Sequence, residues 1–139
     1  MNVLLEGFNA LVASCHEASM KAGWWTEQVT GRRLDLIICY PITHEDHTLA
    51  GALVGQKLML IESEIAEGME GHRTGAQDKH LPHRKSLEVE LADAVIRIAD
   101  LAGALNLDLG GAIVEKLAFN ATRADHKPEA RAAAGGKAY

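Results

Sequence analysis

Four carboxylates on two helical segments have a spacing that could hold a metal ion. Glu64 and Glu67 stand three residues apart, and Glu90 and Asp93 repeat this spacing. Residues three apart share one face of a helix, where two like charges repel unless a cation, a proton or an ion-pair partner lies between them. Oxygen ligands alone suit Mg²⁺ or Mn²⁺ better than iron or zinc. Two facing pairs therefore predict a Mg²⁺ site, with Mn²⁺ as a substitute.

A second interpretation places the same carboxylates in salt bridges inside a helical bundle. The ion-pair partner would be Arg97 or Lys57. Arg97 belongs to a stripe with Glu90, Asp93 and Asp100, and apolar positions flank this stripe on both sides, unlike a solvated helix face. Salt bridges explain one such pair easily, but two matched pairs on separate helices fit the metal interpretation better.

Apolar residues recur at helical spacing in four segments, which must position the carboxylates. The predicted helices cover about residues 3–21, 48–70, 86–105 and 108–123. Residues 24–46 lack this periodicity, and we interpret their short apolar run, closed by Pro41, as strand-like or extended. Because no segment alternates convincingly, the sequence predicts an all-α bundle of four main helices, completed by oligomerisation.

The length and composition of the chain are those of one globular domain. Its 139 residues can bury a core, and 47% are hydrophobic and 24% charged. We expect a single domain over residues 1–127 and a disordered tail over residues 128–139. A net charge of −5 argues against nucleic acid or an anionic membrane as partner. The absence of a long apolar run and of metal-like cysteine spacing predicts a reduced, cytoplasmic protein without a membrane span.

Two further groups of residues have the chemistry to contact a ligand. Lys116, Asn120 and Arg123 share one helix face and could bind phosphate oxygens. Basic residues near a helix C-terminus also complement the helix dipole without binding anything, and both readings stay open. Trp24 and Trp25 follow a glycine, and a tryptophan in a loop can stack on a nucleobase. Taken alone, either tryptophan is better explained as filling the end of the bundle.

Three motifs, taken in order, resemble a known family of enzymes. They are SEIAE at residues 63–67, ELAD at residues 90–93 and EKLAFNATRADHK at residues 115–127. The set resembles the MazG-like family of the all-α nucleoside triphosphate pyrophosphohydrolases, and KAGWW at residues 21–25 resembles the N-terminal segment of its bacterial and phage members. Each motif alone is common in helical proteins, but their order and spacing are specific.

The resemblance implies hydrolysis of nucleoside or deoxynucleoside triphosphates to a monophosphate and pyrophosphate. The four carboxylates would bind Mg²⁺, and Glu64 or Glu67 would also serve as general base. Lys116, Asn120 and Arg123 would bind the triphosphate, and one of the two tryptophans would contact the base. The family builds its site from more than one subunit, which implies a homodimer or a homotetramer.

One residue departs from the family pattern, and two other functions remain open. Ser63 stands where the family has its first glutamate, which leaves the number of metal ions undetermined. The first alternative function is that of a phosphoribosyl-ATP pyrophosphohydrolase-like enzyme, with similar chemistry on a bulkier substrate. The second is a non-catalytic helical module that binds a nucleotide or a protein through the same face.

Overall fold

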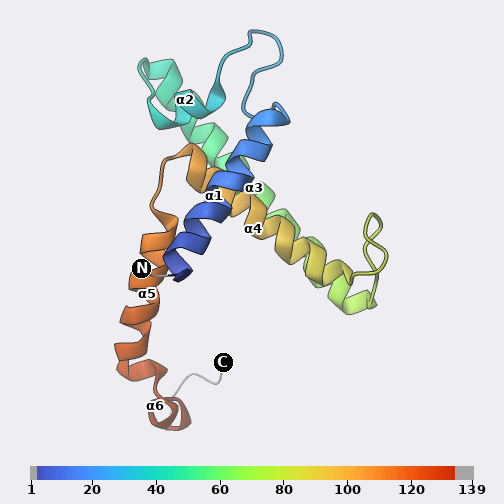
Figure 1. The fold of residues 1–139 in the computed structure, drawn as a ribbon, viewed down its shortest axis with the longest axis vertical. Coiled ribbons are helices and arrows are strands. Elements are labelled where there is room, and N and C mark those ends of the chain that lie inside the picture. Colours follow the sequence, from blue (N-terminus) through green and yellow to red (C-terminus); the bar gives the residue numbers. More distant parts are fainter. Residues whose placement is uncertain (1–2, 134–139) are drawn as a thin grey trace. The chain divides into compact units, whose positions relative to one another are not determined.

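The computed structural model describes residues 3–133, and their regular secondary structure is helical. The helices are α1 (Val3–Lys21), α2 (Leu34–Cys39), α3 (His44–Thr74), α4 (Ser86–Ala104), α5 (Leu109–Thr122), the 3₁₀ helix η1 (Ala124–His126) and α6 (Pro128–Ala132) (Figure 1). The β-pairing within these residues is limited to two isolated bridges, Thr26–Arg33 and Gln77–Lys85. The all-α prediction is confirmed.

The chain divides into two compact units. The described part of one comprises residues 3–9 and 108–133, and the other comprises residues 10–107. The predicted single domain over residues 1–127 spans parts of both units and stays a prediction. No helix in the described part of the chain combines the length and apolar character that crossing a membrane requires.

The unit with the C-terminal helices contains the predicted fourth helix and residues 128–133 of the predicted tail. Asp108 caps α5, because its carboxylate accepts a hydrogen bond from the Gly111 amide at 2.9 Å. Residues 128–132, predicted to be disordered, form the short helix α6. Residues 134–139 of the predicted tail lie outside the described residues.

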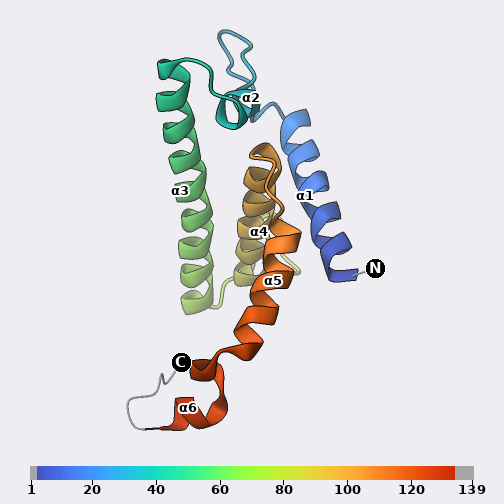
Figure 2. The same ribbon diagram turned by 90° about the vertical axis from the view of Figure 1, so that its left-hand side faces the viewer.

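Helices α3 and α4 form a long antiparallel hairpin in the other unit (Figure 2). A capping box starts α3: the Thr43 hydroxyl accepts from the Asp46 amide at 3.0 Å, and the Asp46 carboxylate accepts from the Thr43 amide at 3.2 Å. This cap places the start of the helix four residues before the predicted Thr48. Gly75, in the left-handed conformation with φ of 65°, ends it.

Two glycines let the backbones of α3 and α4 approach each other closely. A Cβ atom at Gly68 would lie 3.3 Å from the Cβ of Glu90, and one at Gly71 would lie 2.7 Å from the Cβ of Ser86. Such close approach fixes the register of the hairpin, because a larger side chain at either position would push the helices apart. The contact at Gly68 also brings Glu90 close to α3.

The apolar run at residues 34–39 is helix α2, so its interpretation as strand-like was wrong. Ile37 and Ile38 are buried in a core cluster with Trp25. Arg33 forms a bidentate pair with Asp35 in the first helical turn, at 2.7 and 2.6 Å. This hydrogen-bonded pair lowers the pKa of Asp35. Burial on one face and a paired carboxylate at the helix start override the strand propensity of isoleucine.

One apolar face of the hairpin is open. Helical spacing on the apolar faces of the two helices predicts four core positions, Leu58, Ile65, Leu91 and Ile98, and in the structure these are between 39% and 53% exposed. Helical spacing puts them on one edge of the hairpin, and no element among residues 10–107 covers that edge. The core prediction was wrong for these four residues, because periodicity identifies an apolar face but not whether another element packs on it.

Candidate metal centre and adjoining cavity

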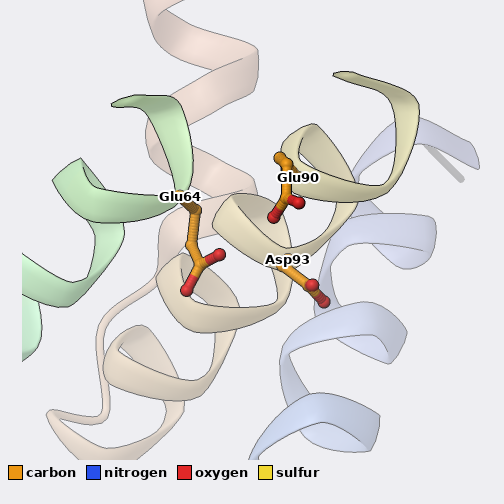
Figure 3. Close-up of side chains that lie close together, drawn as sticks. All are labelled: Glu64, Glu90 and Asp93. Carbon is orange, nitrogen blue, oxygen red and sulfur yellow. The ribbon is translucent and has the colours of Figure 1, made fainter. Parts of the chain in front are cut away.

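Three of the four predicted metal ligands come together between α3 and α4. Glu64, Glu90 and Asp93 each offer a carboxylate oxygen, and these three oxygens lie within 4.8 Å of one another (Figure 3). Glu64 is buried on α3, whereas Glu90 and Asp93 are half-buried and one turn apart on α4. We call these three residues the acidic triad.

Glu67, the fourth predicted ligand, is exposed and lies outside the triad. Its charge still acts on the triad. Burial raises the pKa of Glu90, and the charge of Glu67 raises it further, followed by the effects of Glu64 and Asp93. A carboxyl group whose neighbours oppose its ionisation is one that a bound cation would stabilise in its charged form.

One member of the triad already has a cationic partner. The Nε atom of Arg97 donates to Oε1 of Glu64 at 2.6 Å, and the Glu64 side chain is only 8% exposed. This is the ion pair that the salt-bridge interpretation predicted. Within residues 3–133 no basic side chain pairs with Glu90 or Asp93, so the group keeps two uncompensated negative charges if all three carboxylates are ionised.

A cavity of about 560 Å³ adjoins the triad and shares Asp93 with it. Its size is typical of sites that bind small molecules. The lining comes from α1, α3, α4 and two residues of the turn after α1, Ala22 and Trp24. Its apolar and thiol side chains are Cys15, Ala18, Ala22, Trp24, Leu60 and Ile96, and its polar ones are Ser19, Lys57, Asp93, Arg97 and Asp100.

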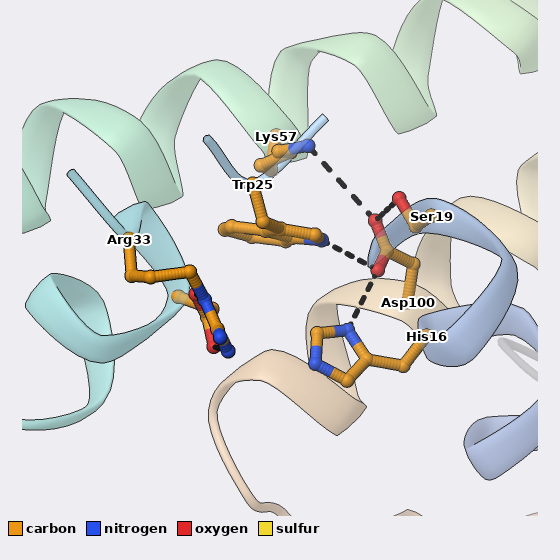
Figure 4. Close-up of polar contacts among 7 residues, drawn as sticks. His16, Ser19, Trp25, Arg33, Lys57 and Asp100 are labelled. Atoms are coloured by element: carbon orange, nitrogen blue, oxygen red, sulfur yellow. Dashed lines mark hydrogen bonds and ion pairs between the residues drawn. The ribbon is translucent and has the colours of Figure 1, made fainter. Parts of the chain in front are cut away.

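A buried carboxylate, Asp100, organises one wall of the cavity (Figure 4). Its Oδ1 accepts from Nε1 of Trp25 at 2.7 Å and lies 2.9 Å from Nδ1 of His16. Its Oδ2 accepts from the Ser19 hydroxyl at 2.9 Å and lies 3.9 Å from Nζ of Lys57. We call these five residues the Asp100 cluster. It ties α1 and the loop after it to the α3–α4 hairpin.

Lys57 and Arg97 bring positive charge to the cavity. The Lys57 ammonium lies 4.1 Å from the ring centroid of Trp25, a cation–π contact, and its side chain is 18% exposed. Burial lowers the pKa of Lys57; the nearby Asp100 opposes this shift, and Arg97 adds to it. Lys57 makes no hydrogen bond with the described residues, and Arg97 uses only its Nε.

The two neighbouring tryptophans have different environments. Trp24 is 70% exposed and lines the cavity, whereas Trp25 is fully buried and bonded to Asp100. The buried ring of Trp25 offers no open face on which a base could stack. The burial of Trp25 therefore argues against the predicted contact between Trp25 and a substrate. The predicted stacking remains geometrically accessible to Trp24 only.

The predicted phosphate contacts belong to the other compact unit. Arg123 donates from Nε and Nη2 to the Asp125 carboxylate at 3.0 and 2.6 Å, and this pair lowers the pKa of Asp125 to about 2. The Lys116 ammonium lies 4.9 Å from the Phe119 ring centroid. The buried Oδ1 of Asn120 has no hydrogen-bond partner within residues 3–133. Their contact with a substrate stays a prediction.

Sequence reasoning did not find the cavity or the residues that shape its polar wall. Lys57 and Asp100 did leave a signal, since Lys57 lies inside the apolar arc of α3 and Asp100 lies in the polar stripe of α4. A charged residue at such a position requires a partner. His16 and Ser19 carried no comparable signal, because their role depends on how α1 packs.

The chain was also compared with known proteins. No protein-family model, no curated protein and no solved structure matches it. The MazG-like resemblance of the motifs stays a prediction, and a function for this chain must be inferred from its residues and their geometry.

Proposed function

We propose that this protein is a Mg²⁺-dependent pyrophosphohydrolase of nucleoside or deoxynucleoside triphosphates, of the MazG-like type. The observation that carries the proposal is the convergence of Glu64, Glu90 and Asp93 within 4.8 Å, directly beside a cavity of about 560 Å³. A metal-binding group and a cavity for a small molecule, joined by one shared carboxylate, are the parts that metal-assisted hydrolysis requires.

The residues of the triad fit Mg²⁺. All three donors are carboxylate oxygens, which is the donor set that Mg²⁺ prefers. Glu90 and Asp93 have no basic partner within residues 3–133, and the charges around Glu90 raise its pKa. A divalent cation would relieve this repulsion and neutralise the two uncompensated charges.

The neighbouring residues supply the rest of the proposed chemistry. Bound Mg²⁺ would polarise the phosphoryl group and lower the pKa of an attacking water. Glu67 is exposed and lies one turn from Glu64, so its carboxylate is available to accept the proton of that water as general base. Trp24, at the cavity wall, would stack on the base.

Pyrophosphate release tests the proposal directly. Purified protein is incubated with Mg²⁺ and a panel of nucleoside and deoxynucleoside triphosphates, and free pyrophosphate is measured. We expect release from at least one of them, and a loss of at least about 100-fold in Glu90→Gln, as is typical when a group that stabilises the transition state is removed. Glu70→Gln is the matched control, because Glu70 is an exposed glutamate paired with Arg73 on the same helix. No release from any substrate would contradict the proposal.

A melting experiment tests the metal site without catalysis. Mg²⁺ that binds only the folded state stabilises it by about 2.7 kcal/mol at 100 times its Kd. We expect the melting temperature to rise with Mg²⁺ in the wild type and in Glu70→Gln, and to rise less in Glu90→Gln. A flat response of the wild type up to millimolar Mg²⁺ would favour the salt-bridge interpretation.

A homodimer or homotetramer is part of the proposal. Support comes from the open apolar face of the hairpin, formed by Leu58, Ile65, Leu91 and Ile98, whose exposure a second copy would remove. Light scattering coupled to size-exclusion chromatography measures the mass directly, and a monomer of 15.0 kDa at all concentrations would contradict it.

The ion pair between Arg97 and Glu64 favours a second candidate function. A carboxylate already held by a guanidinium is a weaker metal ligand, and a non-catalytic nucleotide-binding module would need no metal for hydrolysis. The two candidates differ in one result: the module would bind a nucleotide triphosphate and leave it intact.

A further inference from the structure

Two cations at the cavity have hydrogen-bond donors that the protein does not use. The Lys57 ammonium has three N–H groups, and none of them makes a hydrogen bond with residues 3–133. Arg97 gives its Nε to Glu64, and its two Nη groups have no partner in the same part of the chain. Both side chains line the cavity, so these donors are available to a ligand there.

The two carboxylates that line the cavity, Asp93 and Asp100, are less available to a ligand than the two cations. Asp100 also lines the cavity, but three donors already occupy its oxygens, at 2.7, 2.9 and 2.9 Å. Asp93 belongs to the acidic triad and would turn to the metal. The free polar capacity of the cavity is therefore donating and cationic, which suits a ligand rich in anionic oxygens.

Arg123, the arginine expected to bind phosphate, is by contrast already engaged. Two of its nitrogens donate to the Asp125 carboxylate at 3.0 and 2.6 Å, so a phosphate would have to compete with that bidentate pair. Lys57 has Asp100 at 3.9 Å, which is beyond hydrogen-bond reach, and the Nη groups of Arg97 have no partner within residues 3–133, so neither cation has a bidentate pair to give up.

We propose that Lys57 and the Nη groups of Arg97 bind phosphate oxygens of the substrate inside the cavity. This inference rests on the proposed function and assigns it two substrate contacts. Arg97 would then join the metal site to the substrate, because its Nε holds Glu64 while its Nη groups reach the phosphates. Lys57 would stay fixed in position by the ring of Trp25 and by Asp100, which makes it a preorganised donor.

The test measures binding of inorganic triphosphate, and of a triphosphate analogue with a methylene group between the α and β phosphates, by calorimetry with Mg²⁺. Lys57→Met keeps an unbranched side chain as far as Cε, removes the ammonium, and leaves Asp100 its three hydrogen bonds. We expect it to weaken both ligands about 10- to 100-fold, the loss typical of one charge-assisted hydrogen bond. Arg97→Lys keeps a cation near Glu64 but removes the fork, and should weaken both ligands as well.

Two controls separate a phosphate contact from other effects. Lys79→Met removes an exposed lysine of the loop between α3 and α4 and should leave both affinities unchanged. Mn²⁺ binding, followed by electron paramagnetic resonance, should be unchanged in Lys57→Met, because Lys57 does not touch the triad. Far-UV circular dichroism confirms that each variant is folded.

Two results would overturn the inference. In the first, the wild type binds the methylene analogue but not inorganic triphosphate. In the second, Lys57→Met binds the analogue and inorganic triphosphate with the same affinities as Lys79→Met. These outcomes differ from failure of the proposed function, in which the wild type releases no pyrophosphate. If the wild type hydrolyses triphosphates and Lys57→Met does so with an unchanged KM, only the phosphate contacts are refuted.

Discussion

The neighbouring tryptophans provide a test of the Asp100 cluster, because one is part of it and the other is not. Trp25→Phe removes the indole N–H that donates to Asp100 at 2.7 Å, in a position with no solvent exposure. Trp24→Phe makes the same chemical change at a side chain that is 70% exposed and has no such bond. The two variants therefore differ in environment alone.

The expected cost of Trp25→Phe follows from two losses. A hydrogen bond to a charged group contributes about 1.5–3 kcal/mol to stability. The smaller ring leaves space in a packed core, which costs roughly 1–2 kcal/mol more. We expect the free energy of unfolding to fall by about 2.5–5 kcal/mol, a large part of the roughly 5–15 kcal/mol that stabilises a typical domain. Trp24→Phe should change it by less than about 0.5 kcal/mol.

Urea denaturation followed by far-UV circular dichroism measures both values, since this signal does not depend on the tryptophans. The double variant of Trp25→Phe and Asp100→Asn separates the hydrogen bond from the lost volume. We expect a coupling energy of at least about 1 kcal/mol between the two sites. Equal losses in Trp24→Phe and Trp25→Phe, or a coupling energy near zero, would refute the role assigned to Asp100.

Three further predictions concern helix contacts and charge. Gly71→Ala should destabilise the fold by roughly 1–3 kcal/mol in urea denaturation, because its Cβ would overlap Ser86. Gly55→Ala, in open space on the same helix, should stabilise the fold by up to about 1 kcal/mol. The opposite order of stabilities would contradict the hairpin register. Burial lowers the pKa of Lys57 in the folded state, so the wild type should gain stability relative to Lys57→Met as the pH rises toward 10.5. If the unfolding free energies of the two proteins run parallel with pH, Lys57 is not buried as described. The pKa of Asp35 is lowered in the folded state, so Asp35→Asn should be less stable than the wild type at neutral pH. This difference in unfolding free energy should shrink as the pH falls below 3.8, and a difference that stays constant would contradict the prediction.

Local periodicity separated Glu64 from Glu70 on α3, but it did not separate Glu64 from Glu67, which is exposed and lies outside the triad. Helical periodicity places Glu64 among the apolar positions of α3 and Glu70 on the solvent side, and the structure has Glu64 at 6% exposure and Glu70 in an exposed pair with Arg73. It also placed Glu90 and Asp93 on one face of α4. These predictions succeeded because the position of a side chain around a helix depends only on the residues before and after it.

The parts that sequence reasoning missed depend on packing between distant segments. Ile37 and Ile38 became helical because they pack with Trp25, a contact that no local pattern encodes. Ile65 has the periodicity of a core residue and is 50% exposed, because no element of its unit covers that edge. The cavity exists only because α1 lies against the hairpin, and His16 is 84 residues from its partner Asp100.

The contacts within the hairpin and the contacts of Asp100 differ in sequence separation, and this difference has a consequence for the order of folding. The triad lies within a single helical hairpin whose contacts are local, whereas the bonds of Asp100 to α1 and Trp25 close chain segments of 75 to 84 residues. Long segments cost more entropy to close, so the hairpin should form first and α1 should dock later. Native-state hydrogen exchange should then show the amides of residues 10–21 opening at a lower free energy than those of α3 and α4. A nascent chain would thus complete the acidic triad before it closes the cavity beside it.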